Sequence, residues 1–390
     1  MKQRTLTSRI AAGLSTAASA AEAAAAAARE AAAALEGRET DLAFLFLSSA
    51  HLDGAAEAAA AVTDELAPRA QLGCVADGVL AQGRELEEGP AAAVWASSLP
   101  AATVGSFHVA ALETADGLAV AGFPGVGDPA LVALLVDPFS FPIGAFLQQL
   151  NDEHPGLPLV GGIAPGGGRP GRQALILNDE VHDDGAVGVT VDGIGVRTVV
   201  SQGCAPFGRE SVITRAEGNV IHELAGERAL DRLRADIVAL PPAEQSQVAE
   251  GVLAGLVIDE NKSEYGRGDY LIRGLLGADE ASGSIAVGEQ VRVGQTLRFH
   301  FRDATSADED LREALDRELG RAPAAGALLF SCNGRGTNMF PQPDHDARTI
   351  VEALGRPAVA GFFCGGEIGP VGGRAFLHGF TATLAVFLDT

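Results

Sequence analysis

Lysine is almost absent from this sequence of 390 residues, and acidic residues outnumber basic ones. Lys2 and Lys262 are the two lysines, so nearly every positive charge is the planar, permanently charged guanidinium of an arginine. The 51 acidic and 28 basic residues give a net charge of -23, and this field repels phosphate backbones and anionic lipid headgroups. We therefore expect neither nucleic acid nor a membrane surface as a partner.

Cysteine is also scarce, and its spacing carries no CxxC pair. This argues against a structural zinc site or a disulfide framework, and it favours a reducing, cytoplasmic setting. The histidines lack the H-x-x-x-H and H-E-x-x-H spacings of zinc sites, so we expect no metal site. We expect no cofactor either, although one axial histidine would be enough for haem, which stays open. The four cysteines are Cys74, Cys204, Cys332 and Cys364.

No segment approaches the roughly 20 uninterrupted, strongly apolar residues that a membrane helix needs. The long alanine run near the N-terminus is broken by Glu22, Arg29 and Glu30, and it lacks the core of a signal peptide. Alanine is the best helix former, and Gly37 supplies a stop. We therefore predict that residues 1–40 form an alanine-rich helix packed on the first half of the chain.

The sequence does contain a repeated order of elements. A strand is followed by a helix, by a second strand that runs into glycine, and by further strands. Because a helix joins the first two strands, these should pair in parallel, while the short turns that follow imply antiparallel pairing. The three units begin with "DLAFLFLSSAHL" (41–52), "LVALLVDPFSF" (131–141) and "GALLFSCNGRG" (326–336), with helices predicted over about 55–66, 142–151 and 345–354.

The first and third units share the pattern G-x-x-x-x-G, at residues 73–78 and 361–366, with a cysteine inside each. The block between the second and third units is less clear, with a helix predicted around 219–234, and it is compatible with a degenerate fourth unit. A boundary near residue 240 would then separate residues 41–240 from 241–390. We predict a mixed-sheet α+β fold of two related halves built from these units.

Loops at the carboxyl ends of parallel strands form the natural binding crevice of such sheets. In "SCNGRG" (331–336), two glycines permit sharp turns that expose amide donors, and Arg335 is able to hold an anion bidentately. The alternative is a tight connection to a helix with a solvated arginine. The residues expected on such loops are Ser48, Ser49, Cys74, Asp137, Gly161, Cys332, Asn333 and Cys364.

The stretch "FCGGEIGPVGG" (363–373) places a cysteine and a carboxylate among glycines. A cysteine near a histidine and an acid is compatible with a thiol enzyme that uses Cys364 or Cys332, although a buried cysteine more often acts as a compact hydrophobe. Glu367 aligns with Val79 of the first unit, so the carboxylate distinguishes this copy and is our preferred functional group. The predicted ligand-binding residues are Ser331, Cys332, Asn333, Gly334, Arg335, Gly336, Cys364, Gly365, Gly366, Glu367, Arg374 and His378.

Several motifs resemble those of one protein family. "ALLFSCNGRG", "GFFCGGEIGPVGG" and "FLHGFTATLAVF" are similar to the FIST C-terminal domain, and "DLAFLFLSSAHL", "LGCVADGVL" and "PLVGGIAPGG" to the FIST N-terminal domain. The resemblance spans about residues 41–388. It implies an intracellular signal-transduction module that senses small ligands such as amino acids, and some bacterial relatives are haem-based nitric oxide sensors.

The predicted function is accordingly a cytoplasmic small-ligand sensor that passes its signal to a partner protein. The ligand would be a small polar metabolite, with Arg335 on its anionic group and Glu367 on its cationic group. The alternatives are a haem-based gas sensor and a thiol-dependent enzyme.

Overall fold

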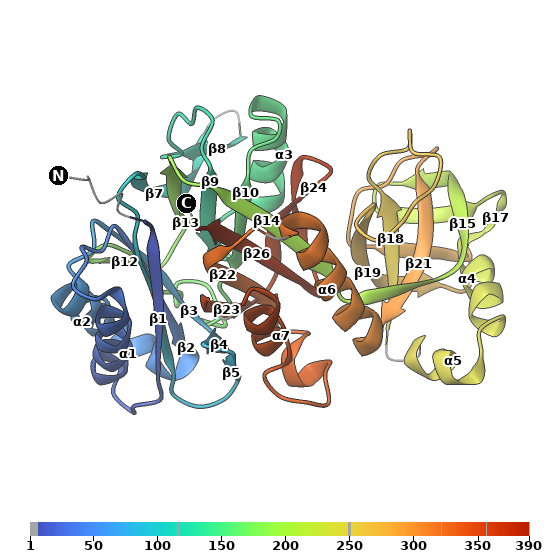
Figure 1. Ribbon diagram of the computed structural model, residues 1–390. Helices are drawn as coiled ribbons and strands as arrows, with labels where there is room; N and C mark the ends of the chain where they lie inside the picture. The colour runs from blue at the N-terminus through green and yellow to red at the C-terminus, as the bar shows by residue number, and fades with distance from the viewer. Residues whose placement is uncertain (1–6, 115–116, 249–250, 321, 356, 390) are drawn as a thin grey trace. The chain divides into compact units, whose positions relative to one another are not determined.

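The computed structural model describes residues 7–114, 117–248, 251–320, 322–355 and 357–389 (Figure 1). The chain forms two compact units, the larger from residues 1–200, 312–377 and 382–390 and the smaller from residues 201–311 and 378–381. The boundary that we expected near residue 240 thus lies inside the smaller unit. None of the helices in the described ranges combines the length and the apolar character that crossing a membrane requires.

The larger unit contains three sheets, and the same arrangement of strands occurs in each. Two parallel strands are joined by a helix, and a third strand lies antiparallel beside the first of them. The mixed-sheet α+β prediction is confirmed. The first sheet has β2 (Leu42–Ser48), α2 (Ala55–Leu66), β3 (Ala70–Ala76) and β6 (Ala92–Ser98); the second has β9 (Leu131–Val136), α3 (Ile143–Glu153), β10 (Leu159–Ile163) and β13 (Ala186–Asp192); the third has β22 (Ala324–Cys332), α7 (His345–Ala353), β23 (Ala358–Cys364) and β26 (Thr381–Leu388).

A short hairpin follows each parallel pair and joins a different sheet. The hairpin of the first sheet pairs with β23 of the third, that of the second with β3 of the first, and that of the third with β10 of the second. The exchange is therefore cyclic, and each sheet is completed by a neighbour. The hairpins are β4 (Val79–Ala81) with β5 (Arg84–Leu86), β11 (Leu175–Leu177) with β12 (Glu180–His182), and β24 (Glu367–Val371) with β25 (Arg374–His378).

One glycine at the same place in each parallel pair lets the second strand approach the first closely. A Cβ atom added to any of the three would lie within 2.2 Å of a leucine carbonyl oxygen on the preceding strand, a distance that real Cβ atoms do not show. Backbone contact of this kind leaves room for glycine only. The pairs are Gly73 with Leu45, Gly161 with Leu134 and Gly361 with Leu329.

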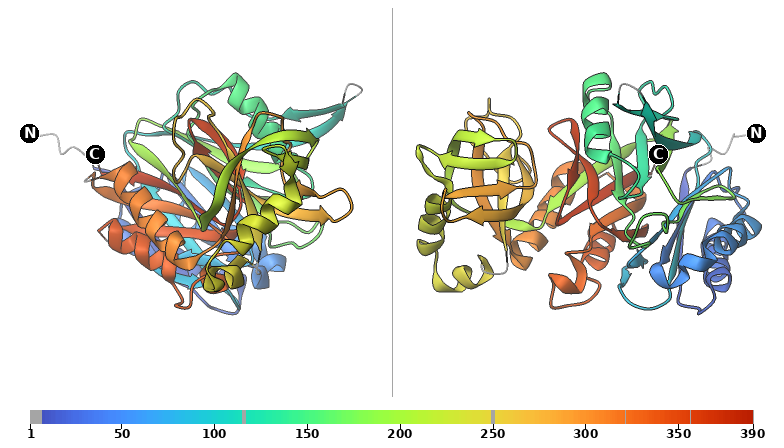
Figure 2. Two further views of the ribbon diagram at one scale, coloured as in Figure 1. Left: turned by 90° about the vertical axis from the view of Figure 1, so that its right-hand side faces the viewer. Right: turned by 180° about the vertical axis from the view of Figure 1, so that it is seen from behind.

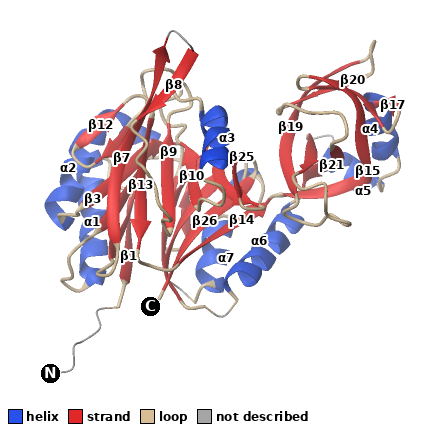
Figure 3. Cartoon of the chain, turned by 90° about the horizontal axis from the view of Figure 1, so that it is seen from above, coloured by secondary structure: helices blue, strands red, loops and turns tan. Residues whose placement is uncertain are grey.

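The N-terminal segment differs from the helix that we predicted over residues 1–40. Within its described part, β1 (Arg9–Ser15) comes first and pairs with β6 at the edge of the first sheet, and α1 (Ala20–Leu35) follows. The small alanine side chains allow α1 to lie directly on the sheet, where a Cβ on Gly13 would meet the carbonyl oxygen of Ala27. Figure 3 shows α1 and α2 together on one face of this sheet.

Aromatic side chains fill the core between the sheets of the larger unit. The ring of Phe46 in the first sheet lies 5.3 Å from that of Phe362 in the third, and Trp95 lies 5.0 Å from Phe387. These contacts hold the sheets together around the hairpin exchange. The remaining strands of this unit are β7 (Thr103–Thr114), β8 (Gly117–Ala121) and β14 (Val196–Gln202), the last of which reaches into the smaller unit.

The smaller unit is an antiparallel barrel, shown in yellow to orange in Figure 2. Strand β15 pairs with both β21 and β16, which closes the circle of strands. Every pairing described there is antiparallel, so this block has a different fold from the three strand–helix–strand repeats of the larger unit. Its elements are β15 (Cys204–Glu217), β16 (Val220–Leu224), β17 (Glu227–Arg228), α4 (Ala229–Val238), α5 (Pro242–Val248), β18 (Val252–Val257), β19 (Tyr270–Asp279), β20 (Ser284–Val287), β21 (Thr296–Arg302) and the start of α6 (Ala304–Leu319).

The helix that we predicted over residues 219–234 is wrong for its first half. Gly218 and Gly226 both have positive φ angles, and each turns the chain between two strands. The side chain of Asn219 donates a hydrogen bond to the carbonyl of Val287 on β20. The apolar spacing of this short segment fits a helix and a strand equally well, and the glycine turns decide for the strand.

Candidate functional site

Two of the predicted loops lie side by side in the larger unit. Cys332 and Cys364 are register partners at the ends of β22 and β23, and the backbone N–H of Asn333 donates a hydrogen bond to the carbonyl of Cys364. Beside these loops lies a pocket of about 160 Å³. Its lining residues are Asp77, Gly78, Glu87, Asn333, Asn338 and Phe363.

Both charged side chains in the pocket lining are carboxylates. Asn333 Nδ2 donates a 2.9 Å hydrogen bond to Asp77 Oδ2. The two oxygens of Glu87 accept hydrogen bonds from the backbone N–H and the hydroxyl of Thr337, also at 2.9 Å. The chain turns at Gly336, where φ is +55° and a Cβ would lie 2.7 Å from Glu87. The pocket is thus anionic, and its walls are tied together by these two carboxylates.

Arg335 does not face this pocket, contrary to our prediction for an anion holder. Its side chain is completely buried, with Nε 2.6 Å from Asp346 Oδ2 and Nη2 2.9 Å from Oδ1. Ser331 donates to the same carboxylate, and His345 Nδ1 lies 3.0 Å from it. Burial alone would raise the pKa of Asp346, but the guanidinium of Arg335 outweighs it and holds that pKa well below its usual range. The arginine is committed to an internal ion pair.

A second buried carboxylate, Glu85 on β5, connects the hairpin of the first sheet to α7. Its Oε1 accepts a 2.8 Å hydrogen bond from the N–H of Ala347 in the first turn of α7, and its own N–H donates to Asp344. A helix N-terminus favours a charged carboxylate. Here burial, as the larger cause, and the negative charge of Asp346 outweigh this effect and raise the pKa of Glu85 to about 8. Folding therefore favours the neutral form of Glu85.

We predict that Glu85 makes the free energy of unfolding depend on pH. A carboxyl group whose pKa is raised on folding, here from 4.5 to about 8, stabilises the fold fully below pH 4.5 and loses that contribution as the pH rises towards 8. In the Glu85→Gln variant the amide oxygen still accepts from Ala347. The urea midpoint should therefore fall between pH 5 and pH 8 for the wild type and change less for the variant. Equal slopes for both proteins would assign the pH dependence to other groups.

Cys364 and Glu367 lie where the third sheet meets the second. Glu367 is completely buried on β24, and its register partner on β10 is Gly162. A Cβ on Gly162 would lie 2.3 Å from Cys364 Sγ, so the thiol occupies the space above this glycine. Burial first, and the charge of Glu367 second, raise the pKa of the Cys364 thiol. This junction is packed, and neither side chain lines the pocket.

The other predicted residues are divided between several environments. Arg374 is exposed on the β24–β25 hairpin, 3.5 Å from Asp152 of α3, and His378 is buried and belongs to the smaller unit. Gly365 and Gly366 exchange backbone hydrogen bonds with Ile163. Of the predicted site, only Asn333 therefore lines the pocket.

The sequence analysis missed most of the pocket lining. Asp77 stands inside the G-x-x-x-x-G motif of the first unit, and that position was a usable signal because the matching loop of the third unit had been singled out. Glu87 carried no such signal, since it follows a hairpin that pairs with a different sheet, and this pairing is not visible along the chain. Asn338 lies just beyond the predicted loop of residues 331–336.

Comparison with known proteins identifies the family. The sequence model of the FIST N domain matches residues 41–227, and that of the FIST C domain matches residues 229–370. The chain belongs to the FIST family. FIST domains are associated with sensory roles in signal transduction. Over 385 residues the chain is 45% identical to "Uncharacterized protein Rv0628c" of Mycobacterium tuberculosis and 44% identical to "Uncharacterized protein Mb0898c" of Mycobacterium bovis, with 98% of this chain and 100% and 99% of those proteins covered.

The pocket draws on both FIST domains. Asp77, Gly78 and Glu87 come from the FIST N segment, and Asn333, Asn338 and Phe363 come from the FIST C segment. A larger hollow of about 450 Å³ lies at the ends of α6 and α7, but it contains none of the glycine-loop residues. We therefore place the candidate site of this FIST protein in the smaller, anionic pocket.

Proposed function

We propose that this FIST protein senses a small, polar metabolite that carries a positive charge and binds in the pocket beside Asp77 and Glu87. The observation behind this is a pocket of about 160 Å³ whose charged lining residues are both carboxylates. The volume corresponds to roughly five water molecules at about 30 Å³ each. It is below the roughly 300 Å³ at which pockets accept drug-sized ligands. A small amine or the ammonium group of an amino acid fits this description.

The contacts inside the pocket suit an ammonium group. An ammonium group offers three hydrogen-bond donors, and hydrogen bonds from a charged donor to a carboxylate are stronger than neutral ones. The two carboxylates already hold the 333–338 loop through Asn333 and Thr337. A cation that competes for Asp77 or Glu87 would therefore change how this loop is held, and a loop that responds to its ligand is the property a sensor needs.

We propose that the signal passes to a partner protein in the cytoplasm. The net charge of -23 favours a basic partner surface, because opposite charges steer association. The four buried cysteines form no disulfide with one another, which fits a reducing compartment.

A thermal-shift screen of amines, amino acids and matched anionic metabolites tests the proposed ligand. A ligand at 100 times its dissociation constant should add about 2.7 kcal/mol to the free energy of unfolding. The shift should be lost in an Asp77→Asn, Glu87→Gln double variant and kept in Asp64→Asn, which changes an exposed carboxylate on α2. Shifts given by anions alone, or equal shifts in wild type and double variant, would reject the anionic pocket as the site.

We also propose that the protein is not a thiol enzyme. All four cysteines are buried, and burial raises the pKa of the Cys74 and Cys364 thiols, whereas a nucleophilic thiol needs a lowered pKa and access to substrate. We predict slow and similar alkylation of the four thiols by iodoacetamide near pH 7, measured by mass spectrometry of the folded protein. Rapid labelling of Cys364 or Cys332 alone would contradict this.

The pocket is also too small for a haem macrocycle, so the haem alternative would require another site.

A further inference from the structure

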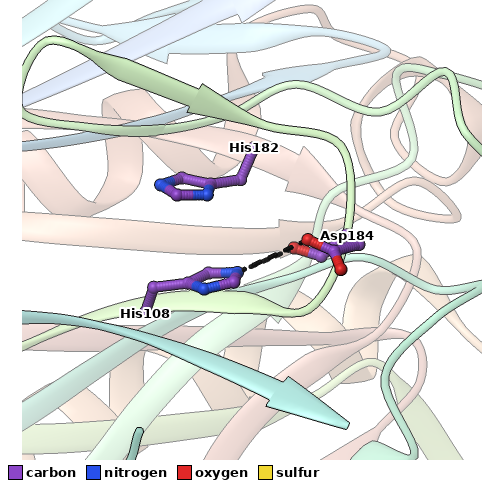
Figure 4. Close-up of side chains that lie close together, drawn as sticks. All are labelled: His108, His182 and Asp184. Carbon is purple, nitrogen blue, oxygen red and sulfur yellow. Dashed lines mark hydrogen bonds and ion pairs between the residues drawn. The ribbon is translucent and has the colours of Figure 1, made fainter. Parts of the chain in front are cut away.

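Two histidines and an aspartate meet in the larger unit, away from the residues of the anionic pocket. His108 lies on β7, His182 ends β12, and Asp184 stands in the turn before β13. One ligand atom from each side chain can be chosen so that all three lie within 4.8 Å of one another. Figure 4 shows the two imidazole rings one above the other, with Asp184 beside them. The ring centroids are 4.2 Å apart and the ring planes differ by 13°.

The fold brings these residues together from two different sheets. Strand β12 is the edge of the first sheet, whereas β7 belongs to the second. Because His108 and His182 are far apart in the sequence, they do not form an H-x-x-x-H motif. The cluster depends on the same exchange of hairpins that completes the three sheets, since β11 and β12 pair with the first sheet after leaving the second.

Gly185 allows the turn that contains Asp184 to lie close to His108. Gly185 has a φ of +74°, and a Cβ there would lie 2.3 Å from the carbonyl oxygen of Val109 and 2.8 Å from His108 Nε2. His108 Nε2 is 3.1 Å from the backbone oxygen of Asp184 and 3.6 Å from its carboxylate. The backbone of this turn thus places Asp184 next to the imidazole, which is the kind of support that a ligand set requires.

The charges around His182 favour a bound cation. The carboxylates of Glu180, Asp183 and Asp184 all lie close enough to its ring to act on it electrostatically. Within the described residues, the buried His182 Nε2 has no hydrogen-bond partner. The carboxylate of Glu180 lies 3.6 Å away from it. This ring nitrogen is therefore not committed to a hydrogen bond among the described residues, and it lies in an acidic surrounding.

We propose that His108, His182 and Asp184 bind a divalent transition-metal ion, with Zn²⁺ as the expected occupant. Two imidazoles and one carboxylate form a ligand set typical of zinc, whereas Mg²⁺ and Ca²⁺ prefer oxygen ligands and Cu(I) prefers thiolates. Ligand atoms around one tetrahedral zinc lie roughly 3.4 Å apart, as bonds of about 2.1 Å require. The ligand atoms now lie within 4.8 Å of one another, so binding would need the widest separation to shorten by about 1.4 Å. Rotation of the two rings and of the exposed Asp184 carboxylate would supply this change.

Three protein ligands leave the fourth position of a tetrahedral ion open. Zinc sites with this composition hold water or an exogenous ligand there, while purely structural sites supply four protein ligands. The ion would also link β12, at the edge of the first sheet, to β7 of the second sheet. The site would therefore connect two sheets and offer a position that a small anion or water can fill.

Titration of the untagged, metal-free full-length chain with Co²⁺, followed by competition with Zn²⁺, tests the proposal. We expect one bound Co²⁺ per chain, visible ligand-field absorption without thiolate charge-transfer bands, and displacement by Zn²⁺. The dissociation constant should rise at least about tenfold in His182→Ala and in Asp184→Asn, since even residues behind the ligands change affinity by 10- to 100-fold. His222→Gln, on β16 of the smaller unit, should bind like the wild type.

Circular dichroism of the metal-free proteins establishes that the variants fold. Zn²⁺ should then raise the thermal midpoint of the wild type and of His222→Gln, and leave that of His182→Ala unchanged. Equal affinity in the wild type and both cluster variants, thiolate bands, or no Co²⁺ or Zn²⁺ binding by the wild type would each overturn the proposal. Because Asp77 and Glu87 are untouched, failure here leaves the amine-sensing proposal standing, and the reverse also holds.

Discussion

Replacement of Gly361 by alanine is expected to remove most or all of the folding stability of the larger unit. The new Cβ would lie 1.7 Å from the carbonyl oxygen of Leu329 and 2.6 Å from its carbonyl carbon, so β22 and β23 would have to separate. Both strands are fully buried at this point. We expect a loss above about 4 kcal/mol, a range reached only by severe core disruption. Urea unfolding followed by circular dichroism, together with the soluble yield, measures the effect.

Gly144→Ala is the matched control for this substitution. Gly144 lies exposed in α3, and an added Cβ there meets nothing within 4 Å. Since alanine is favoured over glycine in helices, this variant should gain roughly 0.5–1 kcal/mol. If Gly361→Ala unfolded within about 1 kcal/mol of the wild type, the close approach of the parallel strands would not be a requirement of the fold.

Arg335→Ala is expected to lower the free energy of unfolding by about 3–5 kcal/mol, because it leaves the carboxylate of Asp346 buried and without its charge partner. Ser331 and His345 would still contact that carboxylate but supply no permanent positive charge. The expected loss can be measured by urea denaturation at pH 7.

Two further variants distinguish a buried ion pair from a general effect of losing an arginine. Arg348 lies on the surface, 3.5 Å from Asp344, and Arg348→Ala should cost less than about 1 kcal/mol. Replacing both members of the buried pair, as in Arg335→Met with Asp346→Leu, should recover much of the loss, since apolar residues of similar volume often substitute for such pairs. A loss below 1 kcal/mol for Arg335→Ala would instead return this arginine to the list of candidate ligand contacts.

The repeated strand–helix–strand order could be predicted because its signals are local. Buried apolar runs mark β2, β9 and β22, and the helices between them carry ordinary amphipathic patterns. The glycine in the middle of each second strand reflects contact between neighbouring backbones, which a sequence pattern can reveal.

The partners of charged residues could not be predicted in this way. Arg335 looked like an anion holder because Asp346, eleven residues later, gave no sign that it would turn back to meet it. Glu87 and His108 reach their sites through strands paired with a different sheet. The barrel was missed for a related reason, since short apolar runs between glycine turns are compatible with either a helix or a strand.

The cyclic exchange of hairpins also bears on how the protein is made. During synthesis β4 leaves the ribosome early, yet its partner β23 follows only near the end of the chain, where Val79 meets Phe362. Until then the early sheet lacks its final neighbour, and the hairpin strands present unpaired edges that invite association with other chains. Contacts between such distant segments also slow folding. The nascent chain is therefore expected to depend on chaperones until its last sheet has emerged.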